Sequence, residues 1–552
     1  MSTETATPVQ MVNVQINGEW KQFPKGTRLI EACGQAGSFV PRYCYHPKLS
    51  SPGNCRMCLI EMGMPKMGPD RKPVIGADGR PEIGWIPRPQ ISCAQDVAEG
   101  MAVRTDSPMV QDCRKGVMEF LLINHPLDCP ICDQAGECRL QEFSVEYGNA
   151  ESRFLEHKVK KPKNVELGPR VTLDAERCVL CSRCIRFMKE VADDDVLGFI
   201  DRGSHSTIAV HPGKKLDSNY SLNTVDICPV GALTSTDFRF KMRVWFLKET
   251  KSFCTSCATG CNTVIASREN RVYRQTPREN NDVNGVWMCD YGRLNIHDLD
   301  SADRLTKPMV RGNDGLEPAT WKEAIDRAGA ELKALKGPEI AVIASARMTN
   351  EELWLTKQLV SAAGTHLRDI VPRSGEADDL LLNADRNPNS TTAALLKISG
   401  PVPGSDLNEI ARQVKNGRLK ALIVLGEDIT SLGLTSEELQ KLPTLIVMNI
   451  LDDATSKNAS IVLPSAGFAE KRGSMINAKG RLQRLNRATN PPGEARDDWE
   501  ILADLIHAVS GGNGLGTIED VFKQMAASVP LFAGLSLSKI GDLGVQLELP
   551  KA

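Results

Sequence analysis

The chain has 552 residues, a hydrophobic fraction of 41% and a formal net charge of −2. This length allows three to five domains, and the near-neutral charge excludes a broad basic surface for nucleic acid. No run of 18 apolar residues occurs, so no segment is expected to span a membrane.

The first ten residues, MSTETATPVQ, have neither the charged nor the apolar region of a secretory signal. They include Glu4, and no arginine precedes Arg28, which argues against a mitochondrial transit peptide. A cytosolic location is therefore expected, where thiols stay reduced. All 17 cysteines lie at or before Cys289, and metal ligation explains them better than disulfides do.

The N-terminal segment predicts a small sheet. Residues 11–16 alternate as a strand does, Asn17-Gly18 is a hairpin signal, and residues 19–23 pair back. Thr27 is the expected cap of a short helix that ends near Ala36.

Four cysteines follow that helix: Cys44, Cys55, Cys58 and Cys93. A strand is expected at 59–62, and the Gly- and Pro-rich residues 63–89 predict an inserted surface loop. This order resembles the plant-type ferredoxin fold with one [2Fe–2S] cluster, although its spacing departs from C-x4-C-x2-C. A zinc knuckle, or thiols unrelated to one another, are the alternatives.

Residues 108–148 are expected to be helical, with Val117, Phe120 and Leu121 on one face. They contain a set of four candidate ligands: His125, Cys129, Cys132 and Cys138. A histidine before a proline is usually a surface turn residue, but its place three residues before C-x2-C-x5-C favours a ligand. Four soft donors suit a [4Fe–4S] cube.

The next set is Cys178, Cys181, Cys184 and Cys228. A two-cluster ferredoxin repeats C-x2-C-x2-C-x3-C-P, with the last cysteine serving the other cluster. Met188 stands where the first run would end, and Ser218, Ser221 and Thr224 replace the other cysteines of the second run. The segment resembles a two-cluster ferredoxin that kept one [4Fe–4S] site.

The last set, Cys254, Cys257, Cys261 and Cys289, resembles the N-terminal [4Fe–4S] domain of molybdopterin oxidoreductases. A structural zinc site is the alternative. Cys33 and Cys113 lie in predicted helices and are expected to be buried free thiols.

From about residue 320 the pattern becomes α/β. Helices are expected at 321–336, with Trp321, Ile325, Ala328 and Leu332 on one stripe, and at 350–363 and 405–416. Buried parallel strands are expected at 340–344, 422–425 and 445–449. Gly512-x-Gly514-x-Gly516 follows a helix, and no Walker A sequence occurs, so no nucleotide or flavin site is expected.

The four sets in this order resemble the large iron–sulfur subunit family of respiratory complex I, the NADH–quinone oxidoreductases. The His125 motif alone is shared with iron-only hydrogenases and with small subunits of bidirectional hydrogenases. Residues 466–499, with Glu470, Gly473 and Asn477, resemble a stretch of molybdopterin enzymes. The chain stops about 50 residues later and has no cysteine after Cys289, so a truncated, non-catalytic tail without molybdopterin is expected.

The resemblance implies a multidomain fold of mixed α+β and α/β class. The expected domains are a [2Fe–2S] domain at 1–107, a His–Cys domain at 108–148, a bacterial-ferredoxin-like domain at 149–246, a molybdopterin-oxidoreductase-type [4Fe–4S] domain at 247–303 and an α/β tail at 304–552.

The resemblance also implies the function: electron relay from an NADH-oxidising flavin subunit toward quinone, in a complex that translocates protons. In the family, electrons enter at the Cys44 set and pass to the Cys178 set, then to the His125 set, while the Cys254 set lies off this path. The implied partners are the flavin subunit and its [2Fe–2S] partner, a ferredoxin-like subunit and other peripheral-arm subunits. The implied location is the cytoplasmic side of the bacterial inner membrane.

Two other hypotheses stay open on sequence alone. One is a truncated molybdenum- or hydrogenase-type enzyme, which needs a metal ligand beyond residue 300. The other is a zinc-bound scaffold without redox function, which explains the C-x2-C pairs but not the position of Cys228-Pro229.

Overall fold

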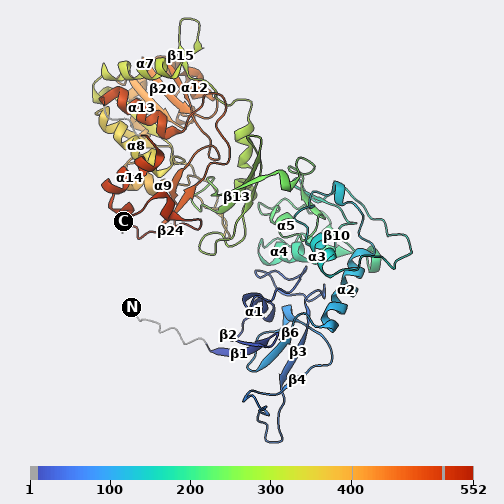
Figure 1. Cartoon of the computed structure of the whole chain (residues 1–552). Coiled ribbons are helices and arrows are strands. Elements are labelled where there is room, and N and C mark those ends of the chain that lie inside the picture. Colours follow the sequence, from blue (N-terminus) through green and yellow to red (C-terminus); the bar gives the residue numbers. More distant parts are fainter. Residues whose placement is uncertain (1–9, 401, 512–515, 551–552) are drawn as a thin grey trace. The chain divides into compact units, whose positions relative to one another are not determined.

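The computed structural model describes residues 10–400, 402–511 and 516–550, which divide into two compact units, Met1–Trp245 and Phe246–Ala552 (Figure 1). The extreme N-terminus and Gly512 and Gly514 of the glycine run lie outside the described residues. Within the described ranges, no helix is long and apolar enough to cross a membrane.

The first unit begins with a six-stranded sheet in the order β2-β1-β6-β3-β4, with β5 paired to β3. Its elements are β1 (Met11–Ile16), β2 (Glu19–Pro24), α1 (Leu29–Gln35), β3 (Leu59–Pro65), β4 (Ile83–Trp85), β5 (Gln90–Ile91) and β6 (Met101–Arg104). The predicted hairpin is confirmed, with Ile16 opposite Glu19. Val12, Val14 and Ile16 alternate into the core that α1 covers.

Short elements make up the rest of this unit. They are α2 (Pro108–Leu122), α3 (Arg139–Tyr147), β7 (Val165–Glu166), β8 (Val171–Leu173), α4 (Arg183–Glu190), β9 (Leu197–Ile200), β10 (Thr207–Val210), α5 (Asn223–Asp226) and β11 (Leu233–Ser235). Three-residue 3₁₀ turns hold two predicted ligands, one at Ser92–Ala94 and one at Cys129–Ile131.

Three local predictions were wrong. Thr27 does not cap α1: the N-cap residue is Arg28, and the Thr27 hydroxyl instead donates to the carbonyl of Pro24. Residues 108–148 form two helices, because the segment around Cys129 leaves the helical path. The buried face of α2 carries Val110, Arg114 and Met118, and Phe120 is 78% exposed.

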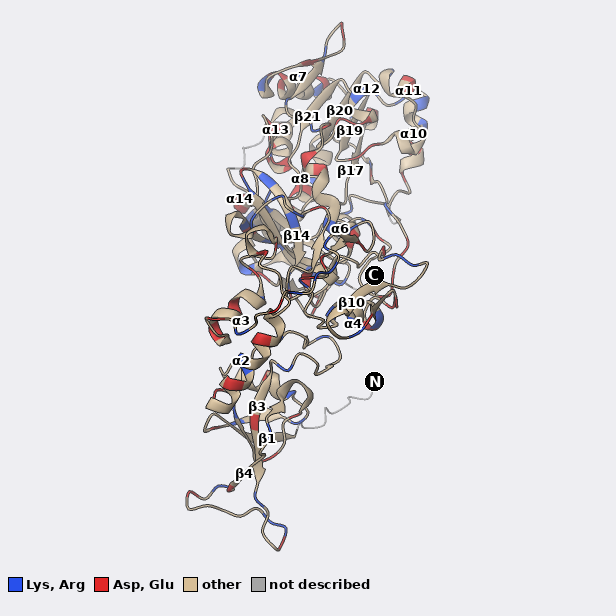
Figure 2. Cartoon of the chain, turned by 90° about the vertical axis from the view of Figure 1, so that its right-hand side faces the viewer, with Lys and Arg blue, Asp and Glu red and all other residues tan. Residues whose placement is uncertain are grey.

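Residues 63–89 are also more ordered than a surface loop. Backbone hydrogen bonds from Lys66 to Glu82 and from Val74 to Lys66 extend the sheet into an arm. Within this arm, Gly68 and Gly76 each begin a turn. The amide of each glycine donates to the carbonyl of the residue four positions later. Figure 2 shows this arm below β4, with both signs of charge along it.

The second unit opens with the sheet β12 (Lys248–Phe253), β13 (Asn262–Arg268) and β14 (Arg271–Pro277), followed by α6 (Asp290–Arg293). A seven-stranded sheet follows in the order β16-β15-β21-β20-β19-β17-β18. Its strands are β15 (Met309–Arg311), β16 (Leu316–Pro318), β17 (Ile340–Ala344), β18 (Leu367–Ile370), β19 (Ala421–Leu425), β20 (Thr444–Asn449) and β21 (Ile461–Pro464).

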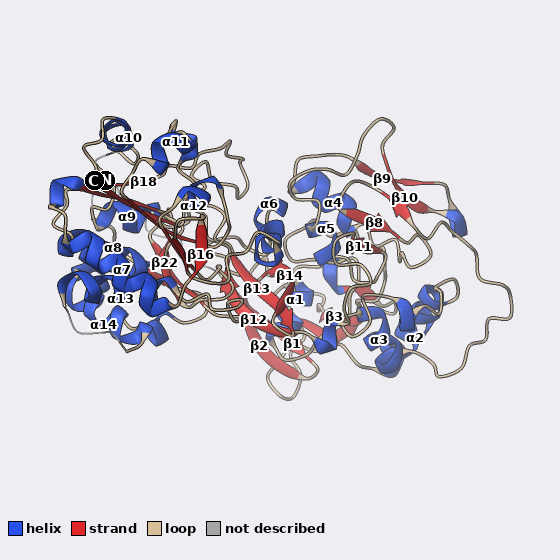
Figure 3. Cartoon of the chain, turned by 90° about the horizontal axis from the view of Figure 1, so that it is seen from above, coloured by secondary structure: helices blue, strands red, loops and turns tan. Residues whose placement is uncertain are grey.

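The predicted parallel strands are confirmed: β18, β17, β19, β20 and β21 pair in parallel. Their residues alternate between two apolar cores, with Val342 on one face and Ile343 on the other. Figure 3 shows helices on both sides of the strands. The helices are α7 (Trp321–Lys333), α8 (Asn350–Ala362), α9 (Ser390–Leu395), α10 (Leu407–Lys415), α11 (Ser436–Gln440), α12 (Ala454–Asn458), α13 (Asp498–Ser510) and α14 (Ile518–Ser528).

A last sheet joins β22 (Gly473–Ile476), β23 (Arg481–Leu485) and β24 (Val545–Gln546). Capping boxes fix the starts of α7 and α8, through Thr320 with Glu323 and Thr349 with Glu352. The predicted stripe Trp321, Ile325, Ala328 and Leu332 is buried in the core of this unit.

Candidate metal centres

The first candidate site lies where the loop after α1 meets the start of β3. The thiol of Cys44 hydrogen-bonds to those of Cys55 and Cys93, and Cys58 hydrogen-bonds to Cys93, so the four side chains are mutually adjacent. The hydrogen bond with Cys93 lowers the pKa of Cys58. The hydrogen bond with Cys44, together with burial, raises the pKa of Cys55. Arg56, with φ +60°, turns the backbone between Cys55 and Cys58.

His125, Cys129, Cys132 and Cys138 line one cavity of about 590 Å³. Burial and the nearby Arg177 lower the pKa of His125 to about 4, so its imidazole is neutral at pH 7. A neutral imidazole presents a lone pair to a metal.

Ion pairs to Asp128 hold the segment between His125 and Cys129 in place. Asp128, just before Cys129, accepts from Lys163 Nζ at 2.6 Å and from Arg177 Nη2 at 3.0 Å. The loop that carries the two central cysteines is therefore tied to the segment preceding Cys178.

Cys178, Cys181, Cys184 and Cys228 line a single small cavity with apolar neighbours such as Ile208. Leu180 and Ser182 adopt positive φ values of 52° and 61°, which turn the chain around the intervening cysteine. Burial, then the neighbouring thiols, raises the pKa of Cys178 to about 12. A thiol so buried stays protonated at pH 7 unless a metal displaces the proton.

Other residue types stand at the positions where a two-cluster ferredoxin has the cysteines of its second cluster. Met188, Ser221 and Thr224 are fully buried, and the Thr224 hydroxyl donates to the Ser221 carbonyl at 2.7 Å. Three of the four positions that lack a cysteine are thus packed in the interior of this unit.

Cys254, Cys257, Cys261 and Cys289 are all buried in the second unit. The amide of Cys254 donates to the carbonyl of Cys261 at 2.7 Å, which closes the loop between β12 and β13. Cys289 is the N-cap of α6, and its sulfur accepts from the amide of Gly292 at 3.4 Å. A Cβ on Gly292 would lie 2.7 Å from the sulfur of Cys254, so the helix start and the loop are in direct contact.

Residues of the α/β tail support this ligand loop. Three hydrogen bonds reach its carbonyls: Ala478 N to Ala258 O at 2.8 Å, Asn477 Nδ2 to Thr259 O at 3.0 Å and Gln483 Nε2 to Gly260 O at 2.8 Å. Their tail residues come from β23 and from the turn between β22 and β23. The tail thus shapes the Cys254 site from outside the ligand set.

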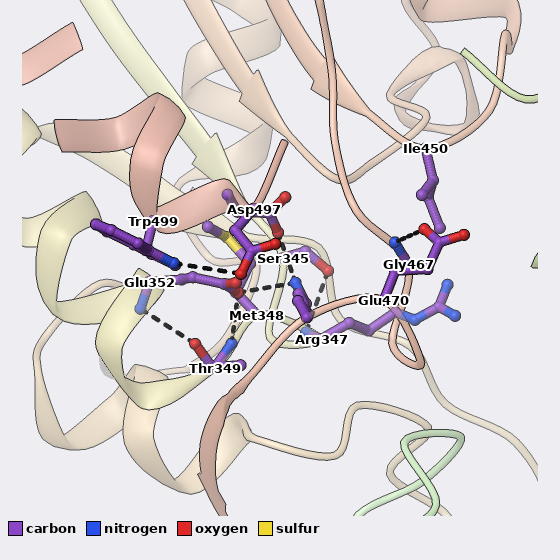
Figure 4. A network of polar contacts seen from close by, with 12 residues as sticks. Ser345, Arg347, Met348, Thr349, Glu352, Ile450, Gly467, Glu470, Asp497 and Trp499 are labelled. Carbon is purple, nitrogen blue, oxygen red and sulfur yellow. Dashed lines mark hydrogen bonds and ion pairs between the residues drawn. The ribbon is translucent and has the colours of Figure 1, made fainter. Parts of the chain in front are cut away.

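The stretch that resembles molybdopterin enzymes forms structural contacts (Figure 4). Glu470 pairs with Arg304 at 2.7 Å and accepts from the amide of Gly467 at 2.6 Å. Lys471 lies buried between Glu352 and Asp498, at 2.9 and 2.6 Å. Lys471 thus has two carboxylate partners, and Glu470 has a guanidinium partner, as buried charges require.

The donor chemistry of all four sets fits iron–sulfur clusters. Thiolates and imidazole are soft ligands, and a cube is bound at its corners, so its ligands surround a volume. Two arginines near the thiols also keep buried N–H atoms without a hydrogen-bond partner, Arg114 at Nε and Nη2 and Arg183 at Nε. Cluster sulfides are acceptors of the type these donors require.

Sequence reasoning missed the residues that connect the sites. Arg186 and Arg183 join the Cys44 loop to the Cys178 set, and a Cβ on Gly231 would lie 2.2 Å from the sulfur of Cys132. The available signal was the pair of arginines inside CSRCIRF. Cys33 is buried as predicted, whereas Cys113 is only partly buried.

Five family models match successive segments of the chain. They are a 2Fe-2S iron-sulfur cluster binding domain at 9–108, the NADH-ubiquinone oxidoreductase-G iron-sulfur binding region at 114–153, the ferredoxin-like domain of NADH-quinone oxidoreductase subunit 3 at 168–234, the NDSU1/NuoG-like 4Fe-4S domain at 247–297 and molybdopterin oxidoreductase at 304–398 and 373–508. The predicted multidomain fold class is confirmed.

Several relatives match over much of the chain. The G subunit of NADH-quinone oxidoreductase from Rickettsia conorii is 30% identical over 95% of this chain and 92% of its own. The 78 kDa subunit of NADH-ubiquinone oxidoreductase from Candida albicans is 32% identical over 90% and 82%. Subunit 3 of the NADH-quinone oxidoreductase from Thermus thermophilus is 40% identical over 66% and 48%.

The fold, the donor sets and the matched domains define an iron–sulfur electron-transfer subunit of an oxidoreductase. The chain belongs to the NuoG family of NADH–quinone oxidoreductase, which comprises the large iron–sulfur subunits of respiratory complex I.

Proposed function

We propose that the chain holds one [2Fe–2S] cluster and three [4Fe–4S] clusters, each on one of the four sets. The [2Fe–2S] ligands are Cys44, Cys55, Cys58 and Cys93. The ligands of the cubes are His125, Cys129, Cys132 and Cys138; Cys178, Cys181, Cys184 and Cys228; and Cys254, Cys257, Cys261 and Cys289. The observation that carries the proposal is that the His125 set and the Cys178 set each line a cavity of their own.

When bound, such clusters accept and release single electrons, at potentials set by charge, hydrogen bonds and burial. The residues of this chain hold the sites close together. Arg186 touches the loops of the Cys44 and Cys178 sets, and Gly231, three residues after Cys228, touches Cys132. These contacts support the relay order of the family, from the Cys44 set to the Cys178 set and on to the His125 set.

The proposed division into domains follows the ligand sets: 1–107, 108–148, 149–246, 247–303 and 304–552. The boundary near 246 coincides with the border between the two compact units. The tail has no proposed cofactor, because its charged residues near Glu470 are paired with one another.

The proposed partners are the NADH-oxidising flavin subunit with its [2Fe–2S] partner, a ferredoxin-like subunit and other peripheral-arm subunits. Leu127 and Ile131, which flank Cys129, are 89% and 59% exposed. Apolar side chains this exposed beside a ligand support docking of another protein there. The proposed location is peripheral, on the cytoplasmic side of a bacterial inner membrane.

The test is elemental analysis of the purified, anaerobic chain. Iron and acid-labile sulfide should both reach about 14 atoms per chain, as one two-iron and three four-iron clusters require. A value near 10 with one equivalent of zinc would remove one cube, and a molybdenum signal would contradict the assignment of the tail.

A further inference from the structure

The helix α4 begins directly after one ligand and carries another. Cys181 lies two residues before its first residue, and Cys184 is its second residue. Arg183 and Arg186 are three residues apart, so their side chains leave the helix on neighbouring positions of one face. Both side chains turn toward the loop that holds Cys44.

Arg186 contacts both sets with one planar group. Its Nη2 donates to the carbonyl of Cys44 at 2.5 Å and to that of Cys181 at 3.4 Å. Its Nη1 donates to the carbonyl of Ser50, and its Nε donates to the hydroxyl of Ser182 at 3.1 Å. Two of these acceptors belong to the Cys44 loop and two to the Cys178 set. A guanidinium can serve several acceptors in fixed directions, which a lysine ammonium cannot.

Arg183 repeats this connection one turn away. Its Nη2 donates to the carbonyl of Tyr45 at 2.6 Å, and its Nη1 donates to the carbonyl of Ile227 at 3.1 Å. Tyr45 follows Cys44, and Ile227 precedes Cys228. The acceptors of the two arginines include the carbonyls of Cys44 and Cys181 and those of the neighbours of Cys44 and Cys228. All acceptors but one are backbone carbonyls.

Two further contacts hold the same surfaces together. The amide and hydroxyl of Ser50 donate to Glu190, the last residue of α4. Asn54, beside Cys55, donates to the carbonyl of Leu180 at 3.1 Å. The loop from Cys44 to Cys55 is thus attached to the Cys178 segment at both of its ends.

The charges of these arginines also act on the ligands. The guanidinium of Arg183 is bound to the carbonyls of Tyr45 and Ile227, so its positive charge lies next to a ligand of each set. A positive charge at low local dielectric favours the more negative, reduced form of a nearby redox group.

We propose that Arg186 and Arg183 are positioning residues that fix the separation between the Cys44 and Cys178 sites and raise the reduction potentials of both. The inference rests on the proposed ligation of these two sites. It adds to that proposal a pair of residues that binds no cluster iron and acts through backbone carbonyls and charge.

The experiment compares the purified complex carrying Arg186→Lys, Arg186→Gln or Lys189→Gln with wild type. Lys189 is the matched control, because it lies on the same helix, carries the same charge and is paired with Asp195 at 3.2 Å at the surface. Redox titration followed by electron paramagnetic resonance gives the two midpoint potentials. The dipolar coupling between the two reduced clusters reports their separation.

Arg186→Gln should lower both midpoint potentials and broaden or weaken the coupling. Arg186→Lys keeps the charge and loses the fixed geometry, so its potentials should stay nearer to wild type while the coupling still broadens. Lys189→Gln should change neither quantity. Potentials and coupling in both Arg186 variants equal to those of Lys189→Gln would overturn the inference.

If Arg186→Gln does not assemble, Arg186→Lys and Arg183→Lys decide the question, since both keep the charge. Unchanged coupling in both would refute the positioning role. Failure of the proposed ligation gives a different result: the wild-type complex itself would then lack one of the two signals.

Discussion

At the scale of single residues, the environment of each ligand determines its chemistry. His125 is neutral because burial and Arg177 oppose its protonation and so lower its pKa. It can therefore replace a thiolate without adding negative charge. The thiol of Cys178 has a raised pKa because it is buried, and binding of a metal must supply the energy to remove its proton.

We predict that His125→Cys retains a four-iron cube at the His125 site, since cysteine is the usual ligand. The added thiolate charge should shift the midpoint potential of this cube downward. NADH–quinone turnover should slow, while reduction of an artificial acceptor at the flavin persists. A redox titration and the two activity assays measure this, and an unchanged potential with unchanged turnover would show that His125 is not a ligand.

At the scale of elements, loops between strands and helices carry the ligands, and neighbouring elements hold those loops in place. The loop 257–261 is a clear case. Residues of β23 and of the turn before it donate to three of its carbonyls. The Cys254 site therefore joins β12, β13 and α6 to the tail within the second unit.

We predict that Cys257→Ala reduces assembly of the complex, because a metal site that closes this loop contributes folding energy, here of the order of a few kcal/mol. Turnover per assembled complex should stay near the wild-type value, because the other three sites remain. Quinone reduction normalised to assembled complex measures this. Full assembly with lost quinone reduction would place the Cys254 site on the main electron path.

At the scale of the whole molecule, the segments around the His125 and Cys178 sets differ from the second unit in what stabilises them. The segments around the His125 and Cys178 sets consist of short helices and sheets of two or three strands. The second unit contains a seven-stranded sheet with apolar cores on both faces. Burial of apolar surface is the main stabilising contribution in such a core.

We predict that anaerobic removal of iron destabilises the segments around the His125 and Cys178 sets more than the large sheet of the second unit. Amides in 123–138 and 174–235 should lose protection from hydrogen exchange, whereas those of β17, β19 and β20 should keep it. Mass spectrometry of exchanged peptides measures the difference. Equal loss of protection in both regions would mean that the tail also depends on bound iron.

Features that depend on residues close together in the sequence could be predicted, whereas features that depend on tertiary contacts could not. The hairpin at Asn17-Gly18 and the stripe on α7 were predictable, because they rest on turn chemistry and on helical periodicity within a few residues. The face of α2 was not: Arg114 is buried there while Phe120 is exposed. Burial of a charged residue is decided by the tertiary surroundings, which here include the thiol of Cys58.

The candidate metal sites also combine features that the sequence predicts with features that it does not. The spacing of the cysteines was visible in the sequence, since each set includes a short motif. The contact of Arg186 with Cys44 joins residues 142 positions apart, and no local pattern encodes it. The arm at 66–82 was missed because its Gly and Pro content is typical of loops, although its backbone pairs as a hairpin does.

The close approach of Gly231 to Cys132 has a consequence for biogenesis. The segment 228–231 supplies a sulfur to one site and forms part of the wall of the next. The site that binds its cluster first orders residues 228–231, which belong to both sites. The second site then forms without a further loss of conformational entropy in that segment. Maturation of the pair in the cell should therefore be cooperative, and chains that contain only one of these two clusters should be scarce.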